Sequence, residues 1–246
     1  MHRPFALNLI FSLLTALGKS NTIQVFSEPE AIELPHSRTA LLVLKDRLTP
    51  NGVLSLLDND INSADSNWHS ILANSSGTPI PAQTNVQALI PTHVMNASTF
   101  LAWFGSDAGG PHKLIGAHPE HYVEQEYHIN GTTSVNIVET WGTLLTHYTL
   151  PDYGPGPKEP YMAALPDYPY QSVAKATLRD GTVIANIHNS VRDKADGSGI
   201  EAVLYGWLPD GVPDDVIEGL RGHQAIEFTN WFKFAYRDII TGAFEP

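Results

Sequence analysis

The dipeptide Asp180-Gly181 constrains the fold of this 246-residue chain more than any other feature. It separates two runs, YQSVAKATLR and TVIANIHNSVR, and Asp-Gly is a preferred pair for the two-residue turn of an antiparallel hairpin. The sequence therefore predicts a hairpin in which Val173 lies opposite His188 and Lys175 lies opposite Asn186.

Counting outward from the turn divides this hairpin into two faces. One face is apolar, with Ala176 opposite Ala185 and Leu178 opposite Val183, and the other is mixed because it carries the polar residues of both strands. Further strands are expected over residues 137–150 and 200–207, which extends the hairpin into an antiparallel meander.

Helices are expected before and after this meander. Apolar residues recur at three and four residue steps between Pro213 and Gly242, which is the pattern of an amphipathic helix. The expected fold class is α+β, with a strongly bent antiparallel sheet, a C-terminal helix and a cavity between the helices and the inner face of the sheet. A Pro/Gly/Tyr-rich stretch over residues 151–170 is expected to form a long loop or lid.

The first 18 residues have the pattern of a secretory signal peptide. A basic start precedes the apolar run FALNLIFSLLTAL, and small residues stand at Ala16 and Gly18. No later segment approaches the ~20 apolar residues of a membrane helix. Residues 19–246 are therefore expected to form one secreted domain without a membrane anchor.

Composition excludes several kinds of chemistry. Cysteine is absent, so the chain has no disulfide, no thiolate ligand and no cysteine nucleophile. Acidic residues outnumber basic ones by 26 to 14, and no Lys/Arg cluster could neutralise several phosphates together, so nucleic acid is not expected as a partner.

Histidine and glutamate are concentrated in HPEHYVEQEYH, residues 118–128. Pro119 keeps His118 out of the helical region, and the segment has no HExxH motif. A strand would place His121 and His128 on opposite faces, whereas a helix would align only these two. Because no single geometry gathers all three histidines, we favour a structural or surface role, keep an acid–base or substrate-binding role open and rank a metal site last.

Other cofactor motifs are also missing from the sequence. The run DNDINSADSN has Ser63 where a calcium loop has its turn glycine and is read as a solvated turn, and Ser106 lacks the glycines of a nucleophile elbow. Neither GxGxxG nor GxxxxGK[ST] follows a strand. We therefore expect no cofactor and no metal, and chemistry carried by side chains alone.

The mixed face of the hairpin supplies the candidate site. Histidine can transfer protons near neutral pH, and Lys or Arg can hold a carboxylate or an enolate. The alternative is that this face simply meets solvent. The candidate catalytic residues are His188, Arg192, Lys175 and His147, and the candidate substrate-binding residues are Asn186, Tyr205, Trp207 and His121.

The segments GPHKLIGAHPEHYVEQEYH, IVETWGTLLTHYTL, SVAKATLRDGTVIANIHNSV and IEAVLYGWLPDGV, followed by a closing helix, resemble secreted fungal proteins of the ketosteroid-isomerase-like class. That class belongs to the NTF2-like group, which includes scytalone dehydratase and SnoaL-type cyclases. The resemblance covers roughly residues 85–240 and implies a cone-like half-barrel covered by helices. Among secreted members of the class with this length, the chain resembles the cyclases of maleidride biosynthesis. This resemblance implies a reaction that joins two maleic-anhydride monomers.

These observations predict a cofactor-independent cyclase, isomerase or lyase that acts on a small organic acid or a polyketide-type intermediate in secondary metabolism. The alternative is a secreted binding protein that holds an apolar ligand without converting it. An enzyme would enclose charged groups with shifted pKa values, whereas a carrier would have a mostly apolar cavity. The expected partner is a small molecule, and a homodimer is left open.

Secretion gives the first testable prediction. Protein from a eukaryotic host should start near Lys19 and carry glycan on at least one of the sequons at Asn74, Asn96 and Asn130. Mass spectrometry of the intact protein and of its peptides measures both features. An intact Met1 together with three unmodified sequons would contradict this prediction.

Overall fold

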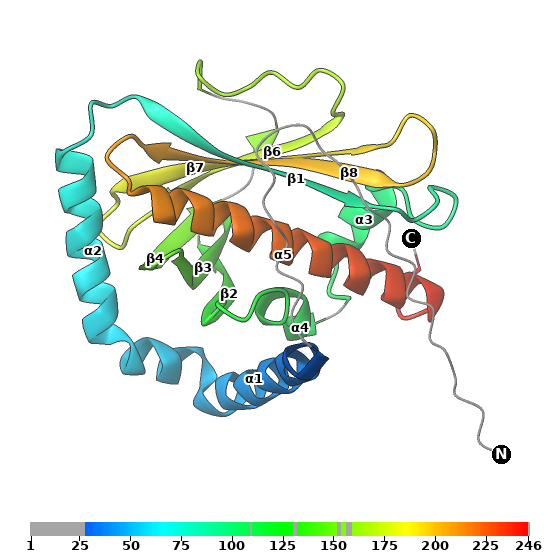
Figure 1. Cartoon of the computed structure of the whole chain (residues 1–246), viewed down its shortest axis with the longest axis horizontal. Helices are drawn as coiled ribbons and strands as arrows, with labels where there is room; N and C mark the ends of the chain where they lie inside the picture. The colour runs from blue at the N-terminus through cyan, green and yellow to red at the C-terminus, as the bar shows by residue number, and fades with distance from the viewer. Residues whose placement is uncertain (1–27, 109, 130–131, 152–153, 156–158, 246) are drawn as a thin grey trace. The chain divides into compact units, whose positions relative to one another are not determined.

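The computed structural model describes residues 28–108, 110–129, 132–151, 154–155 and 159–245 (Figure 1). The predicted signal peptide and the sequon at Asn130 lie outside these residues. The chain divides into two compact units, residues 1–37 and residues 38–246. The second unit contains the sheet and the candidate site.

One antiparallel sheet organises this second unit. Its strands follow the order β1-β8-β7-β6-β4-β3-β2, and a short β5 pairs with β6 beside that path. The strands are β1 (Pro79–Ala88), β2 (Val123–Ile129), β3 (Thr132–Trp141), β4 (Leu144–Pro151), β5 (Gly154–Pro155), β6 (Tyr170–Thr177), β7 (Val183–Asp193) and β8 (Ile200–Pro209).

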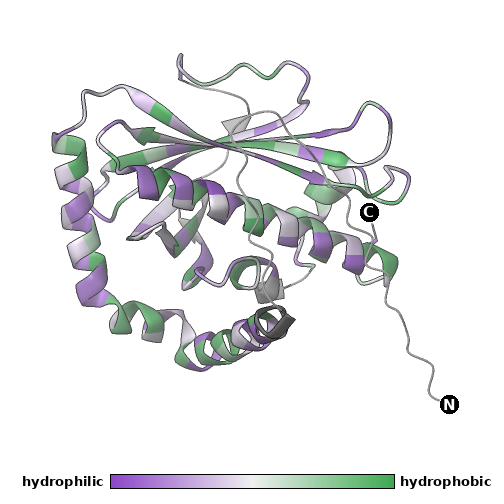
Figure 2. Cartoon of the chain, viewed as in Figure 1, coloured by the Kyte–Doolittle hydropathy of each residue, from purple (hydrophilic) through white to green (hydrophobic). Residues whose placement is uncertain are grey.

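The helices include the predicted C-terminal one, α5, which is continuous through Gly222 and lies against the sheet (Figure 1). Hydrophobic and hydrophilic residues alternate along it (Figure 2), as expected of a helix with one buried face. Within the described ranges, no helix combines the length and the apolar character needed to cross a bilayer. The helices are α1 (Glu28–Leu56), α2 (Asp58–Ala73), α3 (Ala97–Phe104), α4 (Gly110–Ile115) and α5 (Asp214–Ile240).

The α+β class, the antiparallel sheet and the predicted hairpin are confirmed. β6 and β7 pair in the predicted register from Val173 to Ala176, but the register shifts between Ala176 and Thr177. Val183 therefore pairs with Thr177 and not with Leu178. The register shift has a local cause. The Leu178 amide donates to the carbonyl oxygen of Thr182, and this bond closes a longer loop than the predicted two-residue turn.

Two sequence predictions about secondary structure are wrong. Residues 137–150 do not form one strand, because Gly142, with φ of +63°, turns the chain between β3 and β4. The run DNDINSADSN is not a turn, because it lies within α2. Of the sequons that the structure describes, Asn74 is exposed just after α2, and Asn96 caps the start of α3.

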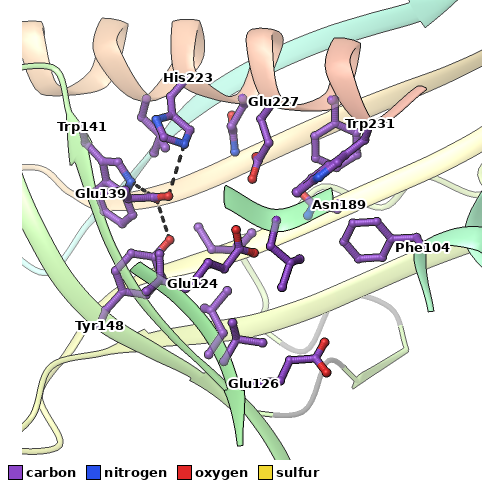
Figure 3. Close-up of a pocket in the computed structure, with 18 of the residues that line it drawn as sticks. Phe104, Glu124, Glu126, Glu139, Trp141, Tyr148, Asn189, His223, Glu227 and Trp231 are labelled. Atoms are coloured by element: carbon purple, nitrogen blue, oxygen red, sulfur yellow. Dashed lines mark hydrogen bonds and ion pairs between the residues drawn. The ribbon is translucent and has the colours of Figure 1, made fainter. Parts of the chain in front are cut away.

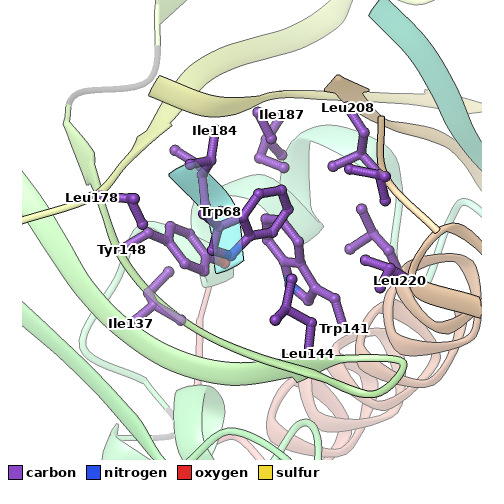
Figure 4. Close-up of a cluster of buried hydrophobic side chains, with 14 of the residues drawn as sticks. Trp68, Ile137, Trp141, Leu144, Tyr148, Leu178, Ile184, Ile187, Leu208 and Leu220 are labelled. Atoms are coloured by element: carbon purple, nitrogen blue, oxygen red, sulfur yellow. The ribbon is translucent and has the colours of Figure 1, made fainter. Parts of the chain in front are cut away.

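The main apolar core lies between the sheet, α2 and α5 (Figure 4). Trp68 of α2 is fully buried and meets Trp141 of β3 edge to face, with ring centroids 5.7 Å apart. The indole N–H of Trp68 donates to the hydroxyl of Thr146 at 3.2 Å, which satisfies its one polar atom inside the core.

A contact between two glycines brings α5 onto the turn between β3 and β4. A Cβ added to Gly219 would lie 2.1 Å from backbone atoms of Gly142, and a Cβ added to Gly142 would lie 2.3 Å from the carbonyl oxygen of Asp215. The two backbones therefore touch with no space for a side chain between them. His223 and Glu227 follow Gly219 on the same helix face, at i+4 and i+8.

This contact gives a prediction about stability. Gly219→Ala should lower the free energy of unfolding by about 1–3 kcal/mol, because the added methyl group forces α5 away from the sheet. Gly222→Ala is the matched control, since its Cβ would meet no atom within 4 Å. It should raise the free energy of unfolding by about 0.5–1 kcal/mol through helix propensity. Urea denaturation measures both, and shifts of the same sign would refute the tight contact.

Candidate functional site

A cavity of about 200 Å³ lies between the sheet and α5 (Figure 3). Most of its wall is apolar, and one end is polar. The sheet contributes Val135, Ile137, Trp141, Leu150 and Ile187 to the apolar wall, and α5 contributes Leu220, Phe228 and Trp231.

Two further hollows share walls with this cavity. One of about 390 Å³ shares Phe104, Asn189 and Trp231 with it and is mainly aromatic and apolar. The other, of about 570 Å³, shares Phe104, Glu124 and Glu126 with it. The three hollows are therefore neighbours around Phe104.

Glu139 of β3 points into the polar end of the cavity (Figure 3). Its Oε1 accepts hydrogen bonds from the indole N–H of Trp141 and from the hydroxyl of Tyr148, the latter at 2.6 Å. Its Oε2 lies 3.2 Å from Nε2 of His223. Burial raises the pKa of this carboxyl, but the imidazoles of His223 and His121 outweigh burial and hold the pKa below its usual range.

His223 and Glu227 lie one turn apart on α5. Burial lowers the pKa of His223, but the Glu139 carboxylate and then Glu120 outweigh it and raise the pKa to about 9. Burial raises the pKa of Glu227, and the nearby imidazole of His121 only partly offsets this effect. Both side chains line the cavity.

His121 completes this group from the turn before β2. Its Nε2 lies 2.9 Å from Nε2 of His223 and 3.3 Å from Oε1 of Glu227. Its Nδ1 lies 2.9 Å from the carbonyl oxygen of Leu114 and 3.2 Å from Oε2 of Glu124. Burial lowers the pKa of His121, but Glu124 and then Glu227 outweigh burial and raise the pKa well above its usual value. We call His121, Glu139, His223 and Glu227 the His/Glu cluster.

Two further residues lie beside the cluster. His118 stacks on His223 with ring centroids 4.0 Å apart, and burial, followed by the charges of His223 and His121, lowers the pKa of His118 to about 2. Lys45 of α1 donates from Nζ to the carbonyl oxygen of Pro119 at 2.7 Å and to that of His121. The amine therefore ties the turn that carries His118 and His121 to α1.

Sequence reasoning missed this cluster because it looked for one regular geometry inside residues 118–128. His118 and His121 lie in a turn, and their partners come from β3 and α5. The side chain of His128 is outside the described part of the chain. The pair His223 and Glu227, one turn apart on a predicted helix, is the signal that could have revealed the site.

The predicted site residues of the hairpin lie on the face of the sheet opposite this cavity. Ile187 and Asn189 line the cavity, and His188 between them points away from it. His188 is buried and hydrogen-bonded through Nε2 to Gln171 at 3.0 Å. The cations on this face are neutralised individually, because Lys175 pairs with Glu159 at 3.0 Å and Arg192 with Glu201 at 2.5 Å.

The remaining predicted residues also lie outside the cavity wall. Asn186 donates to the hydroxyl of Tyr161 at 2.7 Å, and Nε2 of His147 lies 2.7 Å from Oδ1 of Asn136. Tyr205 and Trp207 stack on each other and pack against side chains from residues 161–168. The described part of the predicted lid therefore covers the hairpin face opposite the cavity. Of the predicted residues, His121 alone belongs to the His/Glu cluster.

Comparisons with known proteins identify no family. No family model and no curated protein matches the chain. Solved structures that match include Ara h 8.0201, with a TM-score of 0.38, 12% identity and coverage of 66% of this chain and 99% of that one. The Zhui aromatase/cyclase from Streptomyces sp. R1128 has a TM-score of 0.40, 12% identity and coverage of 65% and 96%.

SA2116 from Staphylococcus aureus, a protein of unknown function, has a TM-score of 0.36, 11% identity and coverage of 67% and 97%. Similarity of this degree assigns neither a family nor an activity to the chain. The resemblance to ketosteroid-isomerase-like proteins and to maleidride cyclases therefore stays an expectation.

The buried position of Glu139 predicts a large effect on stability. Glu139→Leu removes the acceptor that Trp141 and Tyr148 share and should lower the free energy of unfolding by about 3–5 kcal/mol. Glu201→Leu is the control, because it removes a strand carboxylate that pairs with the more exposed Arg192 and should cost about 1 kcal/mol or less. Chemical denaturation compares the two variants. Equal losses would show that the cluster is not an energetically coupled unit.

Proposed function

We propose that this chain is an enzyme whose His/Glu cluster catalyses the isomerisation of a small organic molecule, its cyclisation, or the elimination of a leaving group from it. The observation that carries the proposal is a set of buried, unpaired polar atoms on residues that line one cavity. Oδ1 of Asn189 and Oε1 of Gln224 have no hydrogen-bond partner among the described residues, and both residues line the cavity. Buried polar atoms are nearly always paired in native proteins, so these atoms are suited to a ligand.

The charges of the cluster favour an enzyme over a carrier. Burying an ion costs several kcal/mol, and apolar side chains of the same volume would stabilise the fold at least as well. A carrier for an apolar ligand needs only the apolar walls. A charged cluster at the end of such a cavity therefore fits a reaction centre. The aromatic hollow around Phe100, Phe104 and Trp231 would hold the body of the substrate.

The charge of the cavity favours a neutral substrate. Four carboxylates line it, and the amines of Lys45 and Lys113 nearby already donate to backbone carbonyls. A free organic acid would be repelled, so a polyketide-type intermediate with a carbonyl oxygen fits better, and a neutral anhydride stays within this class. The carboxylates are Glu124, Glu126, Glu139 and Glu227.

The reaction class follows from the groups that reach the cavity. Removing a proton from a carbon beside a carbonyl needs a base, and the negative charge that develops on oxygen needs a positive or hydrogen-bonding partner. Glu227 and His223 supply one group of each kind on neighbouring turns of α5. Return of the proton to a different carbon gives isomerisation, and loss of a leaving group gives elimination. Secretion and a place in secondary metabolism stay predictions.

Solvent deuterium tests this proposal before the substrate is identified. A panel of neutral carbonyl compounds is incubated with the protein in D₂O, and mass spectrometry detects carbon-bound deuterium or a changed mass. The native protein should label or convert at least one compound, and Glu227→Gln should reduce that rate by about 100-fold or more. Glu218→Gln, an exposed carboxylate on the same helix, should keep the native rate.

Binding is measured in parallel by the fluorescence of Trp141 and Trp231, which line the cavity. Compounds that change this fluorescence but acquire no deuterium and no new mass would support the carrier function and overturn the enzyme. Turnover that survives Glu227→Gln but is lost in Lys175→Met would move the site to the opposite face of the sheet.

A further inference from the structure

We propose that His121, His223 and Glu227 bind one divalent metal ion, Zn²⁺ by its donor set, in the wall of the cavity, with the carboxylate of Glu139 beside them. This inference deepens the proposed function because it names a cofactor for the same site. It rests on the arrangement of the donor atoms, and it reverses the expectation, drawn from the spacing of residues 118–128 alone, that no ligand set is assembled.

The distances between the donor atoms are those of ligands around one ion. Zn²⁺ lies about 2.0–2.2 Å from imidazole nitrogen and carboxylate oxygen, so donors at tetrahedral angles are roughly 3.3–3.5 Å apart. Nε2 of His121 is 3.4 Å from Oε2 of Glu139 and 3.3 Å from Oε1 of Glu227. Nε2 of His223 is 3.2 Å from Oε2 of Glu139. His121, His223 and Glu227 each offer an atom within 4.8 Å of the others.

A cluster held only by hydrogen bonds explains these distances less well. Charge-assisted N–H to carboxylate bonds are about 2.7–2.9 Å long, shorter than the three contacts above. The two Nε2 atoms of His121 and His223 are 2.9 Å apart, so at most one proton fits between them. The lone pairs of both rings can be used at once only if a cation lies beside both nitrogens.

Bonds outside the cluster orient two of its four side chains. His121 faces the carbonyl oxygen of Leu114 with Nδ1, which places the proton on Nδ1 and leaves the lone pair of Nε2 free. Glu139 uses Oε1 to accept from Trp141 and Tyr148, which leaves Oε2 free. Outer bonds of this kind are typical of ligands that hold a metal ion.

A divalent ion is compatible with the charge of the buried group. It would replace one proton on each of His121 and His223, and the carboxylates of Glu139 and Glu227 would balance its two positive charges. A donor set of nitrogen and oxygen without sulfur suits Zn²⁺, whereas Mg²⁺ and Ca²⁺ prefer oxygen alone. An ion held here would take over from the Nε2 proton of His223 as the positive partner of a substrate oxygen, and the carboxylate oxygen of Glu227 that does not bind the ion would remain as the base.

A second set of donors, His118, Glu120 and His223, also gathers within 4.8 Å. It is less suited to an ion, because Nδ1 of His118 already accepts the backbone N–H of Glu120 at 3.1 Å. The carboxylate of Glu120 is also 41% exposed. The experiment must therefore separate the two sets.

Metal binding by the full chain is the first measurement. The protein is stripped with a chelator, dialysed and titrated with Co²⁺ and Zn²⁺ by calorimetry and absorption spectroscopy. We expect one ion per chain, the intense visible bands of tetrahedral Co²⁺, and loss of these bands when Zn²⁺ is added. The absence of a saturable site, or the weak bands of octahedral Co²⁺, would overturn the proposal.

Variants identify the ligands. Glu227→Gln and His121→Gln should weaken Zn²⁺ binding by more than about 100-fold, and Tyr148→Phe, which frees Glu139 from one outer bond, by about 10–100-fold. His118→Asn should keep the native affinity. His69→Gln is the surface control, because His69 pairs with the carboxylate of Asp180 at 3.1 Å on the exterior. Circular dichroism confirms that each variant is folded.

The pattern of losses decides between the sets. If His118→Asn abolishes binding while Glu227→Gln does not, the second set holds the ion and the proposal is wrong. If His69→Gln weakens binding as much as Glu227→Gln, the ion binds the surface and the proposal is also wrong. Metal binding without turnover of any compound refutes the proposed function alone, and turnover in a protein that binds no metal refutes this inference alone.

Discussion

The contact between Gly142 and Gly219 is the constraint on which the candidate site depends. Because the two backbones touch, α5 can lie at only one height above the turn that joins β3 to β4. Glu139 precedes Gly142 by three residues, and His223 follows Gly219 by four. The same contact therefore sets the distance between the carboxylate of β3 and the imidazole of α5, and a methyl group at Gly219 would disturb the site as well as the fold.

Trp141 joins the apolar core to the polar cluster. One side of its indole packs against Trp68 in the core, and its N–H donates to Glu139. Rigid packing of the core therefore fixes the direction of the carboxylate, which is what a reaction centre or an ion site requires. The cluster itself adds little stability, because buried ions offset their attraction with the cost of leaving water. Stability comes from the core, and the cluster is kept in spite of its cost.

Local features of the fold could be predicted from the sequence, and the placement of the site could not. The Asp180-Gly181 turn and the periodic pattern of α5 are local, so the hairpin register near Lys175 and the helix were predicted correctly. Alternation along a strand separates two faces but does not say which one a helix covers. That choice depends on the long-range contact of α5, so the sequence could not show which face lines this cavity. The cluster needs three separate segments, so spacing within 118–128 could not reveal it.

The presence of polar residues alone does not distinguish a structural face of the sheet from a reactive one. The two faces differ in how many partners each charged side chain contacts. On the outer face each cation has its own carboxylate, as in the pairs formed by Lys175 and by Arg192, and each pair is complete without a ligand. In the cluster, one nitrogen of His121 lies within 3.4 Å of three other donor atoms, which no set of pairwise proton bonds can satisfy at once. This arrangement of several partners around one nitrogen is the observation on which the proposed metal site rests. Convergence on one point, more than the presence of histidine and glutamate, is therefore what distinguishes this cavity as the candidate site.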